Sequence, residues 1–485
     1  MKKLISVILL LCMLLTVFAA CKGDKKPPVD TSDEQQETEE PNHLDTLPAM
    51  DREGQEFKFL SSSQHETYYD QEEETGDIVE SACFARNLSI EDRYNVDIVY
   101  TAMDGNASGK DAFQTAISTS LQASQQDAYS LVIGQNYYCL PLFTQGAYHN
   151  LREADGIDFD AEWAHKMINE NGTVDGKLFG ASGAVVISQL THALAMYYNK
   201  KHFEDYGFAE QYDIYEIVRQ GKWTYALFYE MVTAFDDVNE EAANAVYGFE
   251  TFYHAAIGLH CGFKNDPIVK NENGEYTTAN YYNTLLEDVY SKIRELYNDH
   301  AGVASEEDLQ RLTNGSSASR MDHLLFSMNY LHGLVEAPMY QKAENRPLGI
   351  LPAPKYDENQ TEYYTRIMRG DLYYIPKNAD FETAALMVEA FNYETYKQVY
   401  PEYWDKVIEL RSADTSEDRE MIQILASTVH SSFAEYFTFS LCDIHQQVAI
   451  EALKNSSSMS VWWGNNEKMV NKRLTKLIES FEALN

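Results

Sequence analysis

The sequence predicts an α/β protein built in two successive parts. Between Glu56 and Gly134, short apolar runs alternate with stretches in which apolar residues recur at helical spacing. This alternation is typical of strand–helix–strand units that form a parallel sheet. Beyond Gly180 a pattern of the same kind begins again. At 485 residues the chain also exceeds one ordinary domain, and no internal repeat of about 20–50 residues is found in it.

The first part is expected to contain three strands joined by two helices. The second helix is the clearest of these elements, because Phe113, Ile117 and Leu121 recur every four residues. Parallel sheets bind ligands at the carboxyl ends of their strands, so the loops at 61–64 and 135–138 are expected to face a binding site. The predicted elements are a strand at 57–60, a helix at 81–94, a strand at 96–100, a helix at 111–123 and a strand at 129–134.

The second part is expected to combine strands, a hairpin and a long amphipathic helix. Thr224 is a credible N-cap for the helix that follows it. Residues 271–274 (NENG) have the composition of a hairpin turn, and the prolines at 348–354 predict an edge strand. The other predicted elements are a strand at 195–198, a helix entered at 199–203, an amphipathic helix carrying Leu285, Leu286, Val289, Ile293 and Leu296, a strand ending at 375–376 and a helix at 382–393.

The first 20 residues are predicted to be an export signal. Two lysines precede an apolar run at 4–18, which is too short for a comfortable transmembrane helix. The stretch at 18–21 (FAAC) resembles a bacterial lipobox, whose cysteine receives a diacylglycerol thioether, so Cys21 is the predicted lipidation site. We therefore expect a lipid-anchored protein on the outer face of the bacterial cytoplasmic membrane. An ordinary signal peptide cleaved near Ala20 is the alternative.

Residues 21–50 are predicted to form a disordered tether, because prolines and acidic residues dominate this stretch. Acids outnumber bases 76 to 38 over the chain, which gives a formal net charge of −38. The tether holds three lysines and eight acidic residues, so most of the negative charge belongs to the body. This charge argues against a protein that binds nucleic acid and against a polybasic membrane-surface protein.

Composition also predicts a folded body, since 44% of the residues are hydrophobic and 13% are aromatic. Four cysteines of the body, Cys83, Cys139, Cys261 and Cys442, lie far apart and show neither CxxC nor zinc-site spacing. Disulfide pairing and buried free thiols both remain open for them. No metal or cofactor is expected.

Several short motifs occur in a fixed order along the body. They are GKLFG at 176–180, MYYNK at 196–200 followed by Phe203 and Gly207, GKWT at 221–224, LGILPAPKYD at 348–357 with Tyr363 and Tyr364, and IPK at 375–377. Together they resemble the family 1 extracellular solute-binding proteins, the lipoprotein receptors of ABC importers that include maltose-binding protein. The chain departs from the family pattern at Tyr225 and Ala226, and the usual Gly-Gly near 259–262 is reduced.

The resemblance implies a two-lobed, periplasmic-binding-protein-like (type II) α/β fold with a hinge and an interlobe ligand cleft. The chain is then expected to cross between lobes near 183–190 and near 340–347. The first lobe would comprise 51–185 and 346–400, and the second 186–345 and 401–485 with the C-terminal helices. Closure on a ligand would be a hinge motion that the permease subunits of an importer recognise. A monomer is expected.

Candidate ligand-binding residues follow from strand ends, aromatic density and the resemblance. Sugars present apolar C–H faces and polar hydroxyl edges, so their sites combine aromatic rings with planar hydrogen-bonding groups. A core or packing role is the alternative for the aromatic candidates and His254, and a surface ion pair with Arg369 is the alternative for Asp371. The candidates are Gln64, Gln135, Asn136, Tyr137, Trp223, Tyr253, His254, Asp371, Trp462 and Trp463.

These observations predict a membrane-anchored receptor that captures a small solute, an oligosaccharide in the favoured interpretation, and delivers it to an ABC importer. The chain has no GxSxG, HExxH, P-loop or GxGxxG motif, and an enzyme is not expected. An exported glycan-active hydrolase remains one alternative, because a catalytic pair of carboxylates cannot be excluded among 76 acidic residues. A surface glycan-sensing or adhesion lipoprotein on the same fold is the other.

Overall fold

The structure, a computed structural model, describes residues 42–484. Within this range the undescribed residues are 72, 106–107, 123–127, 252, 332, 334–346, 368–369, 405–414 and 455–456. The predicted signal, the lipidation site Cys21 and most of the predicted tether therefore lie outside the described residues. The body from Thr46 onward forms one compact unit.

The first lobe contains a four-stranded sheet whose order is β12-β3-β1-β2. Its strands are β1 (Gln55–Ser62), β2 (Val96–Met103), β3 (Leu131–Gln135) and β12 (Asp371–Tyr374). Strand β1 pairs in parallel with both β2 and β3, which confirms the predicted strand–helix–strand units. Strand β12 joins the far side of β3 in the antiparallel sense and places Asp371 opposite Gln135. The start of β12 therefore lies at the same edge as the carboxyl ends of β1 and β3.

Three long helices belong to the first lobe, and all three were predicted. They are α2 (Ile78–Tyr94), α3 (Lys110–Gln122) and α14 (Phe381–Glu394). Asp77 caps α2, because its carboxylate accepts hydrogen bonds from the backbone N–H groups of Val79 and Glu80 at 2.8 and 3.2 Å. Phe391 of α14 packs edge-on against Phe59 of β1 with 4.9 Å between ring centroids, so β1 and α14 share a core.

The second lobe contains a smaller antiparallel sheet of order β10-β4-β9. Its strands are β4 (Leu194–Asn199), β9 (Phe326–Tyr330) and β10 (Leu348–Leu351). Strand β10 is an edge strand, as its prolines predicted, but it pairs with β4. The expected first-lobe assignment of the stretch beginning at residue 346 is therefore wrong for this strand. The lobe to which β10 belongs is decided by its pairing with β4, which lies about 150 residues earlier in the chain. The local sequence pattern does not reveal a partner at that distance.

The helices of the second lobe cover this sheet and extend away from it. They include α6 (Lys200–Asp205), α9 (Tyr225–Thr233), α10 (Tyr253–Gly262) and α11 (Thr284–Asn298). Thr224 occupies the predicted N-cap position of α9, but its side chain makes no capping hydrogen bond. The predicted hairpin is present, because β6 (Val269–Lys270) pairs antiparallel with β7 (Tyr276–Thr277).

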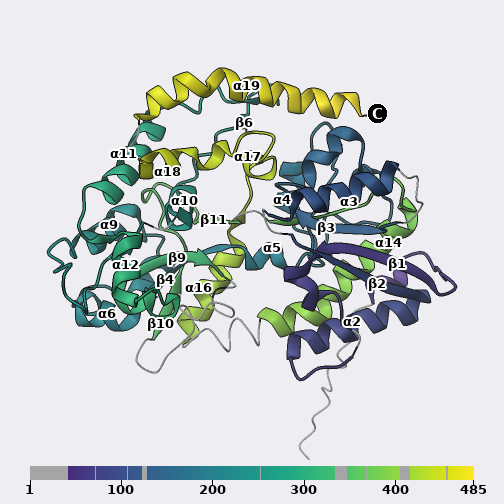
Figure 1. Ribbon diagram of the computed structural model, residues 1–485, viewed down its shortest axis with the longest axis horizontal. Helices are drawn as coiled ribbons and strands as arrows, with labels where there is room; N and C mark the ends of the chain where they lie inside the picture. The colour runs from purple at the N-terminus through teal and green to yellow at the C-terminus, as the bar shows by residue number, and fades with distance from the viewer. Residues whose placement is uncertain are drawn as a thin grey trace, which may run out of the picture. The chain divides into compact units, whose positions relative to one another are not determined.

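Two crossover segments run side by side between the lobes. Isolated bridges pair Ala181 with Tyr373 and Ala193 with Ile367. The short helix α5 (Ser188–Thr191) lies in the first crossover, between the two sheets (Figure 1). The first crossing thus matches the expected position near 183–190. The second falls at 367–371, about 25 residues later than expected, because β10 still belongs to the second lobe.

The C-terminal segment does not finish on the second lobe alone, contrary to expectation. It contains α16 (Ser416–Ser427), α17 (Phe433–Tyr436), α18 (Ile444–Lys454) and α19 (Met459–Ala483). The Tyr436 hydroxyl donates to the carbonyl of Gly180 in the first lobe, and α18 packs against α10 and α11 of the second. Helix α19 extends from the second lobe across to the first (Figure 1).

The remaining elements are short. They are η1 (His43–Thr46), η2 (Ser63–Tyr68), η3 (Leu140–Gln145), η4 (Leu151–Glu153), α4 (Lys166–Gly172), α7 (Phe208–Gln211), α8 (Ile214–Arg219), β5 (Phe249–Glu250), β8 (Val303–Ala304), α12 (Glu306–Thr313), η5 (Ser317–His323), β11 (Thr365–Arg366), the π-helix η6 (Thr395–Val399) and β13 (Val429–His430). None of the described helices is both long and apolar enough to span a membrane. Cys83, Cys139, Cys261 and Cys442 are free thiols in the structure.

Candidate functional site

Five side chains from five separate segments gather where the two lobes meet. They are His65 of η2, His192 just after α5, His254 of α10, Tyr330 at the end of β9 and Asp371 at the start of β12. Ring centroids lie 5.9 Å apart for His65 and His192, 5.3 Å for His192 and Tyr330, and 4.9 Å for His254 and Tyr330. We call these five residues the junction cluster.

Asp371 is the buried anionic centre of the junction cluster. Its Oδ2 accepts a hydrogen bond from the Ser188 hydroxyl at 2.6 Å and lies 3.0 Å from Nε2 of His65. Burial by itself raises the pKa of Asp371, but the interactions with His65, His192 and Ser188 outweigh burial and lower the pKa below its ordinary value. Asp371 therefore carries a carboxylate at neutral pH.

The other oxygen of Asp371 lacks the partners that Oδ2 has. This Oδ1 is buried and has no hydrogen-bond partner among the described residues. The same holds for Oε1 of the buried Gln189, which lies next to Gly370, where a Cβ would come within 2.0 Å of that oxygen. Buried acceptors nearly always have donors in folded proteins, so these two oxygens point to a molecule that donates hydrogen bonds.

The remaining members of the junction cluster supply rings around this carboxylate. The Nδ1–H of His192 donates a 2.6 Å hydrogen bond to the carbonyl of Ser188, which fixes the imidazole ring. Burial lowers the pKa of His192, although Asp371 opposes this effect. His254 and Tyr330 present half-buried rings from the second lobe. The site thus combines one carboxylate, neutral imidazole and a phenol ring.

The predicted candidates at the first-lobe strand ends lie at the expected edge. Gln64 follows β1, is exposed and adjoins His65, while the half-buried Gln135 ends β3 opposite Asp371. Their roles in binding stay predictions. The Nδ2 of Asn136 donates to the carbonyls of Glu435 and Tyr436 at 3.0 and 3.2 Å, while its buried Oδ1 has no hydrogen-bond partner among the described residues.

Tyr137 and the tryptophans pack against other aromatic or backbone groups. Tyr137 packs edge-on against Phe439, and the Lys110 ammonium lies 5.9 Å from its ring centroid. Trp223 is fully buried and its Nε1 donates to the carbonyl of Pro352, which favours the packing alternative for this residue. Trp463 is buried against Tyr281, with Trp462 half-exposed beside it on α19.

One further candidate, Tyr253, begins α10, but its side chain lies outside what the structure describes.

The sequence analysis did not predict three members of the junction cluster, His65, His192 and Tyr330. His65 directly follows the predicted Gln64 and could have been found by considering every side chain of that loop. His192 and Tyr330 gave no such signal, because the strand β9 and the exact end of the first crossover were not predicted.

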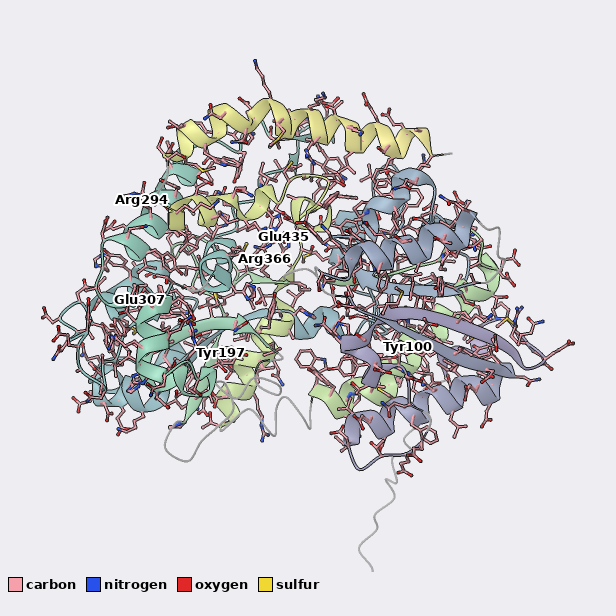
Figure 2. All side chains as sticks on the ribbon, in the orientation of Figure 1. Tyr100, Tyr197, Arg294, Glu307, Arg366 and Glu435 are labelled. Atoms are coloured by element: carbon pink, nitrogen blue, oxygen red, sulfur yellow. The ribbon has the colours of Figure 1, made fainter. Side chains whose placement is uncertain are left out.

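A second polar cluster lies in the second lobe and is too small for a sugar. Arg366 and Glu435, labelled near the middle of Figure 2, form a buried ion pair with 3.0 Å between Nε and Oε1. Together with His260 and Cys261 they line a cavity of about 10 Å³. That volume holds about one water molecule. No group of three or more metal-ligating side chains suited to a metal ion occurs among the residues that the structure describes.

Several solved ABC-transporter sugar-binding proteins are similar to this chain in architecture. The MalE sugar-binding protein from Xanthomonas citri is 13% identical, with a TM-score of 0.57, and the match covers 88% of this chain and 99% of that one. The galacto-N-biose/lacto-N-biose I-binding protein from Bifidobacterium longum, in complex with lacto-N-biose, is 12% identical at a TM-score of 0.56 and covers 90% and 98%.

An ABC substrate-binding protein from Listeria monocytogenes, in complex with cycloalternan, is 15% identical at a TM-score of 0.55 and covers 87% and 99%. No family model and no curated protein matches the sequence. At these identities the likeness concerns architecture, and it extends over nearly the whole of each solved chain. The body of this protein therefore has the two-lobed α/β fold of ABC-transporter sugar-binding proteins.

Proposed function

We propose that the protein is an extracytoplasmic solute receptor that captures an oligosaccharide between its lobes and delivers it to an ABC importer. The observation that carries the proposal is the buried Asp371, whose Oδ1 has no partner among the described residues at the junction of the lobes. A buried acceptor without a donor costs about 1–3 kcal/mol, and a sugar hydroxyl that donates to it recovers this free energy.

The chemistry of the junction cluster favours a neutral sugar. Hydroxyl groups donate to Asp371 and Gln189, and the rings of Tyr330 and His254 offer apolar faces to sugar C–H groups. The similar solved structures support the same ligand class, because they hold lacto-N-biose and cycloalternan. The residues contributed by both lobes would then close around the ligand by hinge motion.

Equilibrium binding tests this proposal. Isothermal titration of the purified protein with cycloalternan, lacto-N-biose and maltose should show saturable binding of at least one sugar. Asp371→Asn keeps the shape of the side chain but removes the charge, so we expect about 10- to 100-fold weaker binding, in line with about 1.5–3 kcal/mol for a charged hydrogen bond.

Asp97→Asn on the exposed part of β2 is the matched control and should bind like the wild type. Thermal melting of both variants separates a lost contact from a lost fold. Binding of no sugar, together with tight binding of an amine, would refute the carbohydrate assignment. If chromatography instead detects hydrolysis of the bound sugar, the hydrolase alternative is established.

Anchoring and transport are further parts of the proposal. The lipobox-like sequence ending at Cys21 supports lipidation, and mass spectrometry of the membrane fraction should find a diacylglyceryl group on that cysteine. Cys21→Ser should release the protein from the membrane. Stimulation of an importer's ATPase in proteoliposomes by the sugar-loaded protein would distinguish delivery from sensing or adhesion.

A further inference from the structure

Helix α19 is attached to both lobes at widely separated points. Its 25 residues run from Met459 to Ala483 without interruption. The two attachment points, Trp463 and Phe481, are 18 positions apart, which corresponds to about 27 Å along a helix axis. An unbroken helix of this length resists bending, so it transmits the position of one attachment to the other.

The attachment to the second lobe involves several residues. Trp463 is 5% exposed and packs edge-on against Tyr281, with 5.1 Å between the ring centroids. Further along the helix, Asn471 accepts a 2.5 Å hydrogen bond from the Thr278 hydroxyl. Helix α19 also contacts α11 and α18. This end of the helix is therefore firmly part of the second lobe.

The attachment to the first lobe rests on one aromatic side chain in the last turn. Phe481 is 1% exposed and lies between Phe143 and Phe179, at 4.7 and 5.5 Å between ring centroids. The Lys177 ammonium donates a 2.6 Å hydrogen bond to the carbonyl of Phe481, which caps the end of the helix. The last turn of α19 is therefore held by the first lobe.

Between its two attachments α19 crosses from one lobe to the other. Its inner face buries Val470, Leu474 and Leu477. An open groove of about 910 Å³ runs along the helix, and its lining comes from Val174 and Asp175 of the first lobe, from the β6–β7 hairpin of the second and from α19 itself. A helix that borders both lobes and is held at both ends has the geometry of a strap across two bodies.

We infer that α19 is a strap that limits rotation of the lobes about the 181–194 and 367–373 crossovers, with Phe481 as its latch. Rotation that widens the angle between the lobes on the α19 side requires Phe481 to leave its aromatic site. The strap therefore holds the lobes in the arrangement that assembles the junction cluster. Loss of the latch should enlarge the range of lobe positions in the protein without ligand.

Small-angle X-ray scattering of the unliganded protein tests this inference. Phe481→Ala should increase the radius of gyration and broaden the distance distribution. Hydrogen exchange at residues 181–194 should become faster, while exchange in β1 and β4 stays slow, since each lobe remains folded. Lys177→Met removes only the hydrogen bond to the latch and should shift both measurements in the same direction by less.

Met469→Ala, an exposed position on the same helix, is the control and should match the wild type. If Phe481→Ala melts cooperatively but scatters like the wild type, the strap is refuted. If it fails to fold, Lys177→Met decides, and unchanged scattering and hinge exchange in that variant overturn the inference. No sugar is needed, so the outcome is separate from that of the proposed function.

Discussion

At the scale of single residues, burial decides between binding and packing. Trp223 and Asp371 were both candidates for the ligand site, and both are buried. The indole N–H of Trp223 donates to the carbonyl of Pro352, and its ring packs against Phe228 and Phe326. Asp371 keeps an acceptor without a partner among the described residues. Packing and ligand binding are therefore distinguished by whether the polar atoms of a buried side chain already have hydrogen-bond partners, and not by the residue type.

Trp223→Ala should therefore destabilise the fold without changing the junction cluster. Removing a fully buried tryptophan leaves a cavity and an acceptor without its donor, so we expect a loss of about 3–5 kcal/mol in the free energy of unfolding. Chemical denaturation measures this loss. Trp462→Ala, at a half-exposed position, should cost far less, and equal losses in the two variants would contradict the assignment.

At the scale of elements, helix and strand positions follow local pattern while caps depend on geometry. Helices α2, α3, α11 and α14 and strands β1 to β4 appear close to their predicted positions. Apolar periodicity identifies them because it is carried by neighbouring residues. A cap depends on the rotamer that places an oxygen near an N–H group. Asp77 makes this contact and Thr224 does not.

This difference predicts unequal effects of two cap substitutions. Asp77→Ala should reduce stability by about 1 kcal/mol, because α2 loses the acceptor for two backbone N–H groups. Thr224→Ala should change the free energy of unfolding by less, since no capping bond is lost. Urea titration of the two variants compares them directly. A larger loss for Thr224→Ala would contradict the observed geometry.

At the scale of the whole molecule, buried histidines make stability depend on pH. Burial lowers the pKa of His165 to about 4 and that of His260 to about 3, and lowers the pKa of His192 as well. In the unfolded chain a histidine takes up its proton near pH 6.5. Between that pH and the folded pKa the unfolded state binds more protons, so stability falls as the pH is lowered.

The expected slope is about 1.4 kcal/mol per pH unit for each such histidine. Guanidinium denaturation at several pH values from 7.5 to 4.5 should show this loss in the wild type. Glu389 offsets part of it, because burial raises the pKa of this carboxyl to about 7 and the folded state then binds its proton more readily over the same range. His260→Gln removes one of the groups, so its stability should fall less steeply over the same range. An identical slope in the wild type and the variant would show that His260 takes up its proton in the folded protein too.

The sequence by itself determined the local elements and the edge of the first sheet where the junction cluster lies, and its candidates include two members of that cluster, His254 and Asp371. Short-range periodicity and strand ends carry this information. Only the tertiary structure decided that β10 belongs to the second lobe, that α19 attaches to both lobes, and that His65, His192 and Tyr330 join one cluster with Asp371. These features depend on contacts between segments tens to hundreds of residues apart, and pairing across such distances leaves no periodic trace in the chain.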